Sequence, residues 1–213
     1  RDATKIVIED GITKIGDYAF VYFNKLNSVN IADSVTTIGN KAFYECSALS
    51  EFIGGNGIVS IAENAFGNDN QHLKNAIPYE NGVRYLGNAI VGCDTESITG
   101  ELVIKNGVTV IPKYAFECAE MTSVKIPSSV TSIESSAFAY CPNLKNITIP
   151  DSVTYIGECA FEACPLLESV ILGKNVKKLD CSAFSSCINL KTVTLQEGLE
   201  YIGECAFYGC FAL

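Results

Sequence analysis

Histidine is almost absent from this sequence: His72 is the only one among 213 residues. A Ser/His/Asp or Cys/His nucleophile needs a histidine as its base, and His72 lies in a turn rich in Asn, Asp and Gln with no identifiable partner. Paired catalytic carboxylates lack a pattern as well, because the 24 acidic residues are scattered over positions that we expect to face solvent. We therefore expect no enzyme activity.

Positive charge is also scarce. The 15 Lys and Arg residues against 24 acidic ones give a net charge of −9. This balance disfavours nucleic-acid binding and attachment to anionic membrane surfaces, both of which depend on a surplus of cations. No apolar run approaches the ~18 residues that a membrane span requires. The first ten residues lack the apolar core of a secretory signal, and we expect both ends to be truncated from a longer protein.

Metal and phosphate motifs are missing. The sequence has ten cysteines but no Cys-x-x-Cys pair and no Cys/His cluster, which a structural zinc site would need. The glycine-rich stretch at 53–57 does not precede a helix, and Asp69 is the only carboxylate in the Asn-rich stretch at 67–71. We expect no cofactor and no metal, so the cysteines need another explanation.

What the sequence does contain is a repeated phrase. An Ala-Phe pair recurs with its Phe at positions 20, 43, 66, 116, 138, 161, 184 and 207, and most intervals are 23 residues. The interval of 50 contains one degenerate unit, marked by Ala89-Ile90. This period predicts a solenoid of about nine units, because no unit of that size can bury its apolar side alone.

Other apolar positions keep the same phase. Ile147-x-Ile149 alternates as a strand with one buried face does, Pro150 begins a turn, and Val153 to Gly157 forms a second short extended piece. The Ala-Phe-x-x-Cys segment spaces its apolar groups as one short helical turn would. We predict an α/β fold in which each unit is strand, turn, short strand and helical turn, β-rich overall and continuous over residues 1–213 as one domain.

The period is disturbed at about 67–104. Asn81-Gly82 is a hairpin-type turn signal, and the segment 83–91 is apolar enough to cover part of the stack. We interpret this region as a degenerate unit with an insertion.

The columns L-x-x-V-x-I-P-x-S-V-T-x-I-G-x-x-A-F-x-x-C resemble the BspA-like class of leucine-rich repeats, over essentially the whole chain. Residues 144–164 and 26–46 are the clearest copies. The resemblance implies a curved, right-handed solenoid, a secreted or cell-surface location as in bacteria and some protists, and adhesion or protein recognition in place of catalysis. It carries no ligand over to this chain.

Seven cysteines share one column and are predicted to form a buried ladder of thiols, because Phe23 occupies the same column and free Cys packs as a small hydrophobe. They are Cys46, Cys93, Cys118, Cys141, Cys164, Cys187 and Cys210. Cys118 is included because its unit is one residue short.

The other three cysteines are Cys159, Cys181 and Cys205. Cys159 and Cys205 are two units apart, too far for a bridge, since neighbouring units are about 5 Å apart. Cys159 with Cys181 is the one cross-unit pair that could form a disulfide, and the sequence leaves open whether it does.

Binding in a solenoid takes place on exposed columns. The residues that flank the buried positions of the long strands are mostly short and uncharged, which suits either a hydrogen-bonding platform or a solvated sheet. They are Ser28, Asn30, Ser123, Lys125, Asn146, Thr148, Ser169, Ile171, Thr192 and Thr194. On the short strands Tyr155, Lys178 and Tyr201 share one column, which predicts a lysine between two rings, either as a packing cluster or as a binding site.

The function that these observations favour is a non-catalytic recognition or adhesion module, binding a host or matrix protein or a glycan. Two alternatives stay open: a structural spacer or envelope array with binding elsewhere in the full-length protein, and an intracellular interaction scaffold, to which many free thiols would be suited.

Overall fold

The computed structural model describes residues 2–62, 64–67 and 76–213. The chain divides into two compact units, Arg1–Glu80 with Arg84–Val91 (unit 1) and Asn81–Val83 with Gly92–Leu213 (unit 2). His72 and Asp69 lie outside the described residues. The expectation of one continuous domain stays a prediction. No helix of the described part is long and apolar enough to cross a membrane.

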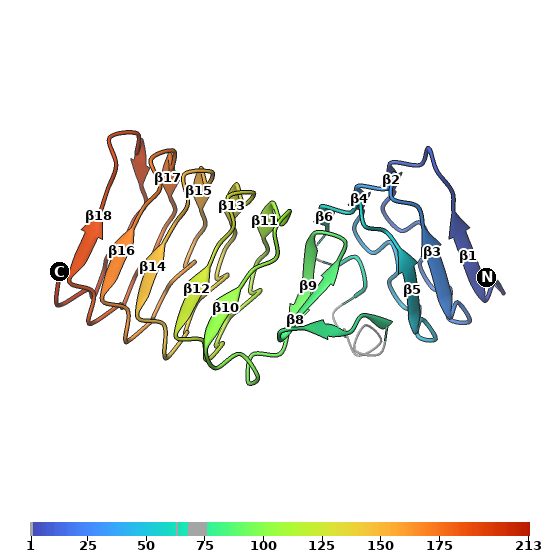
Figure 1. Ribbon diagram of the computed structural model, residues 1–213, viewed down its shortest axis with the longest axis horizontal. Helices are drawn as coiled ribbons and strands as arrows, with labels where there is room; N and C mark the ends of the chain where they lie inside the picture. Colours follow the sequence, from blue (N-terminus) through green and yellow to red (C-terminus); the bar gives the residue numbers. More distant parts are fainter. Residues whose placement is uncertain (1, 63, 68–75) are drawn as a thin grey trace. The chain divides into compact units, whose positions relative to one another are not determined.

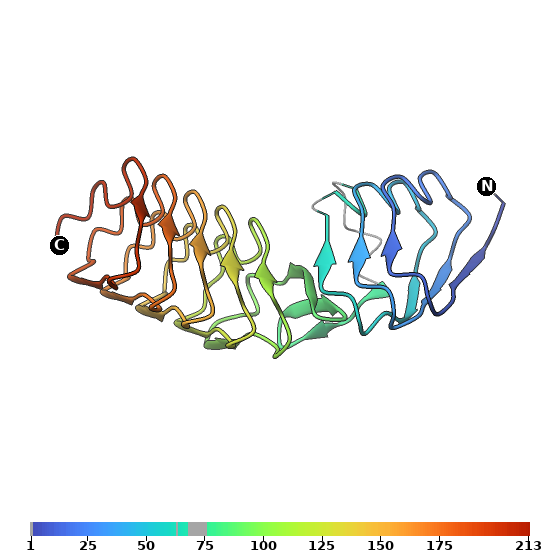
Figure 2. The same ribbon diagram turned by 90° about the horizontal axis from the view of Figure 1, so that it is seen from above.

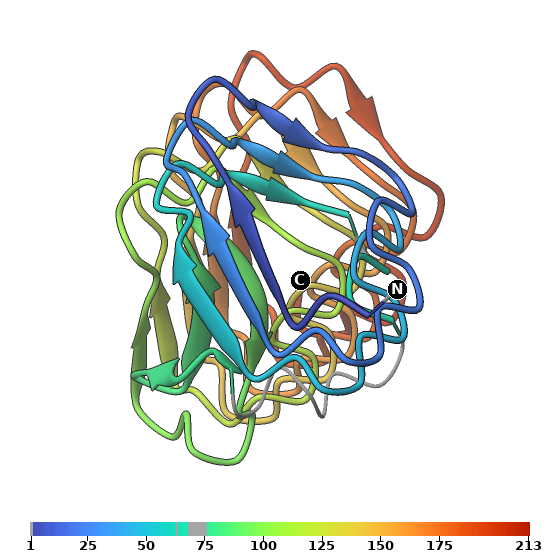
Figure 3. The same ribbon diagram turned by 90° about the vertical axis from the view of Figure 1, so that its right-hand side faces the viewer.

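Unit 1 contains two small parallel sheets. The long strands β1 (Lys5–Ile8), β3 (Ser28–Ile31) and β5 (Glu51–Gly54) form one, and the short strands β2 (Lys14–Ile15), β4 (Thr37–Ile38) and β6 (Ser60–Ile61) form the other. Figure 3 shows this unit end on, with the two sheets on different sides of each turn. Partners are 23 residues apart, as in Ile6↔Val29 and Val29↔Phe52, so the register follows the repeat.

Unit 2 has the same plan with five strands in each sheet. The long-strand sheet holds β10 (Glu101–Val103), β12 (Ser123–Lys125), β14 (Asn146–Thr148), β16 (Ser169–Ile171) and β18 (Thr192–Thr194), side by side in chain order (Figure 1). The short-strand sheet holds β11 (Val110–Ile111), β13 (Ser132–Ile133), β15 (Tyr155–Ile156), β17 (Lys178–Leu179) and β19 (Tyr201–Ile202), which Figure 2 shows as a separate row. The sequence therefore forms a β-solenoid of the leucine-rich-repeat type.

The helical turn and the α/β class are corrected by the structure, because the Ala-Phe segments are not helical. Alternate backbone N–H groups of each segment bond the next turn of the stack. Phe161 N donates to Ala183 O at 2.8 Å, and Ala163 N donates to Ser185 O at 2.8 Å. A helix would have directed these groups along its own axis, so neighbouring turns could not have been joined in this way.

The remaining N–H groups close β-turns within the segment. Ala160 N donates to Gly157 O at 3.2 Å, and Glu162 N donates to Cys159 O at 3.0 Å. The alternation requires a left-handed residue on each side of the Ala-Phe pair, here Cys159 with φ 54° and Ala163 with φ 51°. The apolar spacing in the sequence fits either geometry, and the hydrogen bonds to the next turn decide between them.

The disturbed region forms a three-stranded sheet of β7 (Tyr79–Glu80), β8 (Val83–Leu86) and β9 (Ala89–Cys93). Asn81 and Gly82 connect β7 and β8 with φ values of 51° and 81°, so the predicted hairpin turn is confirmed. The reading of Ala89-Ile90 as a degenerate Ala-Phe turn was wrong, because both residues lie in β9. Repeat turns therefore number three in unit 1 and five in unit 2 among the described residues, fewer than the nine expected.

A file of stacked phenylalanines runs through the core of each unit. In unit 2, Phe138 and Phe161 stack at 5.2 Å between ring centroids, and Phe161 and Phe184 stack at 5.1 Å with an interplanar angle of 1°. All three rings are fully buried. In unit 1, Phe43 stacks on both Phe20 and Phe66. The Ala-Phe pair is thus the element that joins neighbouring turns through packing.

The cysteine column has a polar role besides packing. Five of its thiols donate to the backbone carbonyl of the phenylalanine one turn earlier, as from Cys164 Sγ to Phe138 O at 3.2 Å and from Cys187 Sγ to Phe161 O at 3.1 Å. Cys46, Cys141 and Cys210 make the same contact, whereas Cys93 Sγ donates to Ala115 O at 2.9 Å. Burial raises the pKa of Cys46 to about 11, which keeps the thiol protonated as a donor.

The ladder is shorter than expected. Cys46, Cys141, Cys164 and Cys187 are buried, whereas Cys93 and Cys210 are half-buried and Cys118 is exposed. Placing Cys118 in the ladder was wrong: it is the left-handed residue of its turn, with φ 60°, and Ala119 fills the buried position. This unit is one residue shorter than the others, and the shortening falls after Ala119. Cys118 therefore keeps the same position relative to the Ala-Phe pair as the corresponding residue of a unit of normal length.

Candidate functional site

The outward residues of the long strands form one surface in unit 2, which we call the sheet face. Pairing in register brings Asn146, Ser169 and Thr192 into one row and Thr148, Ile171 and Thr194 into a second. Ser123 pairs with Asn146, and Lys125 lies two residues after Ser123 on β12. Ser123 and Ser169 are half-buried, and the other six are exposed. The structure therefore brings together all eight predicted residues of this unit.

Ser28 and Asn30 belong to unit 1 and differ from that pattern. Ser28 was expected to face solvent, but only 8% of it is exposed. Its Oγ donates to Glu51 Oε2 at 2.7 Å, so the longer side chain of the next strand covers it. Asn30 is half-buried. The predicted platform is thus not continued by Ser28 in the unit 1 sheet.

Most hydroxyl groups of the sheet face form no hydrogen bond within the described part of the chain. Ser169 Oγ donates to Asn146 Oδ1 at 2.6 Å. Among the described residues, no hydrogen bond is formed by the side chains of Ser123, Thr148, Thr192 or Thr194. Hydroxyl groups held on a regular sheet can donate and accept at the same time, so this row can bind a partner's backbone or polar side chains.

Two residues of β10 extend the sheet face and were missed from the sequence. Glu101 pairs with Ser123 and Val103 pairs with Lys125, and both are exposed. Val103 is 50% exposed and Ile171 47%, which gives the otherwise polar surface two apolar points. The repeat spacing, counted back from Phe116, would have placed these two residues on a long strand. They were missed because the insertion that precedes them disturbs the repeat.

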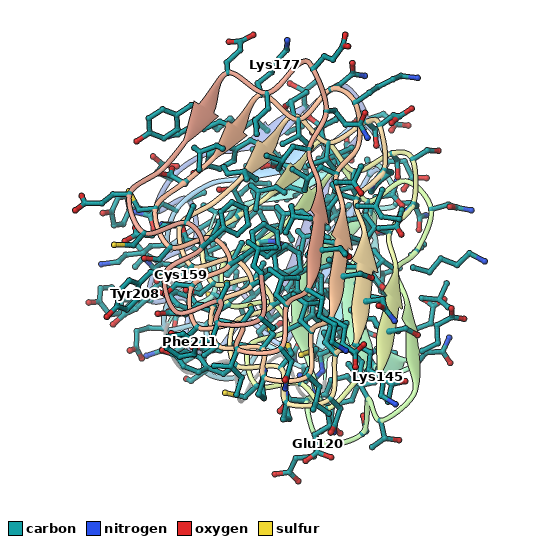
Figure 4. All side chains as sticks on the ribbon, turned by 90° about the vertical axis from the view of Figure 1, so that its left-hand side faces the viewer. Glu120, Lys145, Cys159, Lys177, Tyr208 and Phe211 are labelled. Atoms are coloured by element: carbon teal, nitrogen blue, oxygen red, sulfur yellow. The ribbon has the colours of Figure 1, made fainter. Side chains whose placement is uncertain are left out.

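The sheet face also carries cations in an acidic protein. Lys191 pairs with Glu168 at 3.0 Å, whereas Lys125 and Lys145 form no ion pair within the described part of the chain. Figure 4 shows Lys145 on the long-strand side, and Cys159 and Tyr208 on the side formed by the Ala-Phe turns. A partner of this face would meet two free ammonium groups.

The short-strand column places a lysine between two rings, as its spacing predicts. Lys178 pairs with Tyr155 on one side and Tyr201 on the other, and its Nζ lies 5.5 and 5.3 Å from the two ring centroids. Both distances are within the range of a cation–π contact.

Asp180 completes this cluster and was missed from the sequence. Its Oδ2 accepts from Lys178 Nζ at 2.9 Å and from the Tyr155 hydroxyl at 3.0 Å, while Oδ1 accepts the Cys181 N–H at 2.9 Å. The Lys178 hydrogen bond lowers the pKa of Asp180, and burial, reinforced by Asp180, raises the pKa of Tyr155 to about 12. The sequence could have indicated this contact, because Lys178 and Asp180 are two residues apart and residues i and i+2 of extended chain lie on one face. The cluster satisfies its own charges, which supports a packing role.

The cysteines outside the buried column lie on the turn side. Cys159 N donates to Cys181 O at 3.0 Å, so the two residues are on neighbouring turns, but all ten cysteines are free thiols in this structure. Burial raises the pKa of Cys159 to about 12, with further contributions from Glu162 and Glu158. Within the described residues, no group of three or more His, Cys, Asp or Glu could hold a metal ion.

A sequence profile of the BspA type leucine rich repeat region matches residues 2–117 and 109–213, with six copies. No curated protein matches the chain. Among solved structures it is similar to a leucine rich repeat protein of T. pallidum, with 24% identity over 100% of this chain and 79% of that one and a TM-score of 0.46. A leucine rich cell surface protein of Faecalibacterium prausnitzii has 22% identity over 100% of this chain and 75% of that one, with a TM-score of 0.44.

Proposed function

Because the chain belongs to the BspA-type leucine-rich repeat family, we propose that it is a non-catalytic recognition module that binds a protein partner through the sheet face of unit 2. The observation that carries this proposal is the row of hydroxyl side chains at Ser123, Thr148, Thr192 and Thr194, which make no hydrogen bond within the described chain. A secreted or cell-surface location, with a host or matrix protein as partner, follows from the family resemblance.

The shape of the surface supports this function. Five parallel strands in one register hold the outward side chains on a regular support, which lowers the entropy lost on binding. Val103 and Ile171 supply exposed apolar area that a partner can bury, which adds hydrophobic stabilisation to the polar contacts around them.

The experiment is a binding screen of the protein against arrays of purified extracellular proteins and glycans, followed by substitution of the sheet face. Thr148→Arg with Thr194→Arg places bulk on two exposed positions and should weaken binding of a true partner at least about tenfold, since about 1.4 kcal/mol is lost for each factor of ten.

Thr154→Arg is the control, because Thr154 is also exposed but precedes the short strand β15. Its Oγ1 donates to Thr131 O at 3.2 Å, so circular dichroism must show that this variant is folded. Equal loss of binding in the control would place the contact elsewhere. The absence of any binder at micromolar concentration would favour the spacer alternative, in which the array only separates other parts of a longer protein.

A further inference from the structure

A second lysine lies among tyrosine rings on the turn side of unit 1. Lys41 Nζ is 5.2 Å from the ring centroid of Tyr44 and 6.0 Å from that of Tyr18. Tyr22 meets Tyr44 edge-on at 6.1 Å. We call Tyr18, Lys41 and Tyr44 the Lys41 cluster. Tyr18 is 52% exposed, and Lys41 and Tyr44 are half-buried, so the group is open to solvent on one side.

The ammonium of this cluster has no anionic partner among the residues that the structure describes. Within residues 2–62, 64–67 and 76–213, Lys41 forms no ion pair and donates to no side-chain or backbone oxygen from Nζ. Asp17 directly precedes Tyr18, and its Oδ1 accepts the Asn40 N–H at 2.9 Å, whereas Glu45 directly follows Tyr44 and is exposed. Neither is paired with Lys41, so three ammonium donors are available to an incoming acceptor.

The same chain shows what such an arrangement binds when an acceptor is present. In unit 2, Lys178 also lies between two tyrosine rings, and there the Asp180 carboxylate takes hydrogen bonds from both the ammonium and a phenol. A carboxylate fits because one oxygen can accept from both donors, and hydrogen bonds between charged groups are stronger than neutral ones. The Lys41 cluster has the lysine and the rings but takes no carboxylate from the described part of the chain.

The backbone holds these bulky residues in an unfavourable conformation. Tyr18 and Lys41 have φ values of 58° and 52°, in a column that elsewhere in the chain holds Ser136 and Ser182 but also Tyr114 with φ 58°. A non-glycine residue in this region costs on the order of 1 kcal/mol. Gly67 lies against the Tyr44 ring, where a Cβ would come within 3.0 Å of Cδ2, so this ring is closely packed on one side.

We propose that the Lys41 cluster is a binding site for a carboxylate supplied by a partner protein, from an Asp or Glu side chain or from a chain end. The partner's oxygen would accept from Lys41 Nζ and from a tyrosine hydroxyl, as Asp180 does within unit 2. This site is separate from the sheet face of unit 2 and does not depend on the function proposed there.

The test is a titration of the isotope-labelled protein with sodium acetate, followed by NMR of the Lys41 ammonium and the tyrosine rings. Acetamide, which has the same shape without the charge, and sodium chloride at equal ionic strength are the reference titrations. We expect saturable shifts at Lys41, Tyr18 and Tyr44 with acetate alone. Equal shifts with chloride would mean charge screening only and would overturn the proposal, as would no shift with any of the three.

Three variants sharpen the result. Lys41→Gln keeps much of the stem and should weaken acetate binding about tenfold or more, because the charged donor is lost. Lys41→Arg should retain binding. Glu45→Gln removes a nearby negative charge and should strengthen binding, so a weaker response in this variant would contradict the electrostatic basis of the site.

The unit 2 cluster is an internal control. In the unmodified protein its lysine is already paired, so acetate should not shift Lys178 or Tyr155. In Asp180→Ala the carboxylate is gone, and acetate should then bind there with similar strength. If this opened cluster did not respond, the comparison that supports a carboxylate ligand would fail, whatever the sheet face binds.

A partner that presents its carboxylate on a folded surface should bind more tightly than acetate, because neighbouring contacts add to the ion pair. A peptide with a free terminal carboxylate and its amidated twin make this comparison. Binding of both forms equally would show that the carboxylate is not recognised.

Discussion

The two lysine–tyrosine clusters of this protein use the same side chains with different results. Lys178 begins strand β17, and Asp180, which follows directly after this two-residue strand, hydrogen-bonds to its ammonium. Lys41 lies on an Ala-Phe turn, where residue i+2 is Phe43 and is directed into the core. The Lys178 cluster therefore has a carboxylate from its own chain, which pairs the ammonium and stabilises the fold, and we call it the closed cluster. The Lys41 cluster has no such carboxylate among the described residues, and we call it the open cluster.

The largest expected effect concerns the file of stacked phenylalanines in the core of each unit. Phe161→Ala and Phe43→Ala should each destabilise the protein by ~3–5 kcal/mol, because both rings are almost fully buried and stacked on two neighbours. Urea denaturation monitored by circular dichroism measures this loss. Phe211→Ala, at a ring that is 87% exposed, is the control and should cost less than about 1 kcal/mol.

The next effect distinguishes the closed cluster from the open one. In Asp180→Ala, the pKa of Tyr155 should fall below about 12 but stay above the ordinary value of ~10, because burial, the largest cause of the rise, remains while the carboxylate that accepts the proton and repels the anion is removed. Ultraviolet titration of tyrosinate, with Tyr155→Phe to identify the signal, measures the change. An unaltered Tyr155 titration would mean that burial alone sets this pKa.

The repeat period predicts much of the fold because, in a solenoid, each strand pairs with the strand one repeat further along the chain. A shift of 23 residues places Val29 beside Phe52 and Val170 beside Val193, whatever the turns look like. The rows of the sheet face follow from the same count. Strand positions and their partners could therefore be predicted from sequence alone.

The turns could not be predicted in this way. The spacing of Ala160, Phe161 and Cys164 satisfies a helical turn and a run of β-turns equally well, and the difference lies in where the backbone N–H groups go. The error at Cys118 has a related cause. A single missing residue can fall before or after the cysteine, and only the buried Ala119 shows which.

Contacts between side chains of neighbouring turns could not be predicted from the sequence either. Ser28 has the short polar character of an exposed residue, but Glu51 on the next strand hydrogen-bonds to it and covers it. Asp180 is one of 24 acidic residues and stands out only when its distance to Lys178 is known. Such contacts depend on rotamers, which the period does not specify.

The smallest expected effect is the acid dependence of stability at the closed cluster. The lowered pKa of Asp180 means that its ionised form stabilises the fold. This contribution is fully present above the unfolded pKa of ~3.9 and is lost as pH falls through the lower folded value.

Asp180→Asn removes the titrating group. The unfolding free energy of this variant should therefore decline less steeply than that of the unmodified protein between about pH 4 and pH 2. Because Lys178 is 43% exposed and solvent screens the pair, the difference should be small. Lys41→Gln removes a lysine that forms no ion pair with any described carboxylate, so it should leave the acid slope unchanged. Urea denaturation at a series of pH values would contradict the comparison of the two clusters if both variants changed the slope equally.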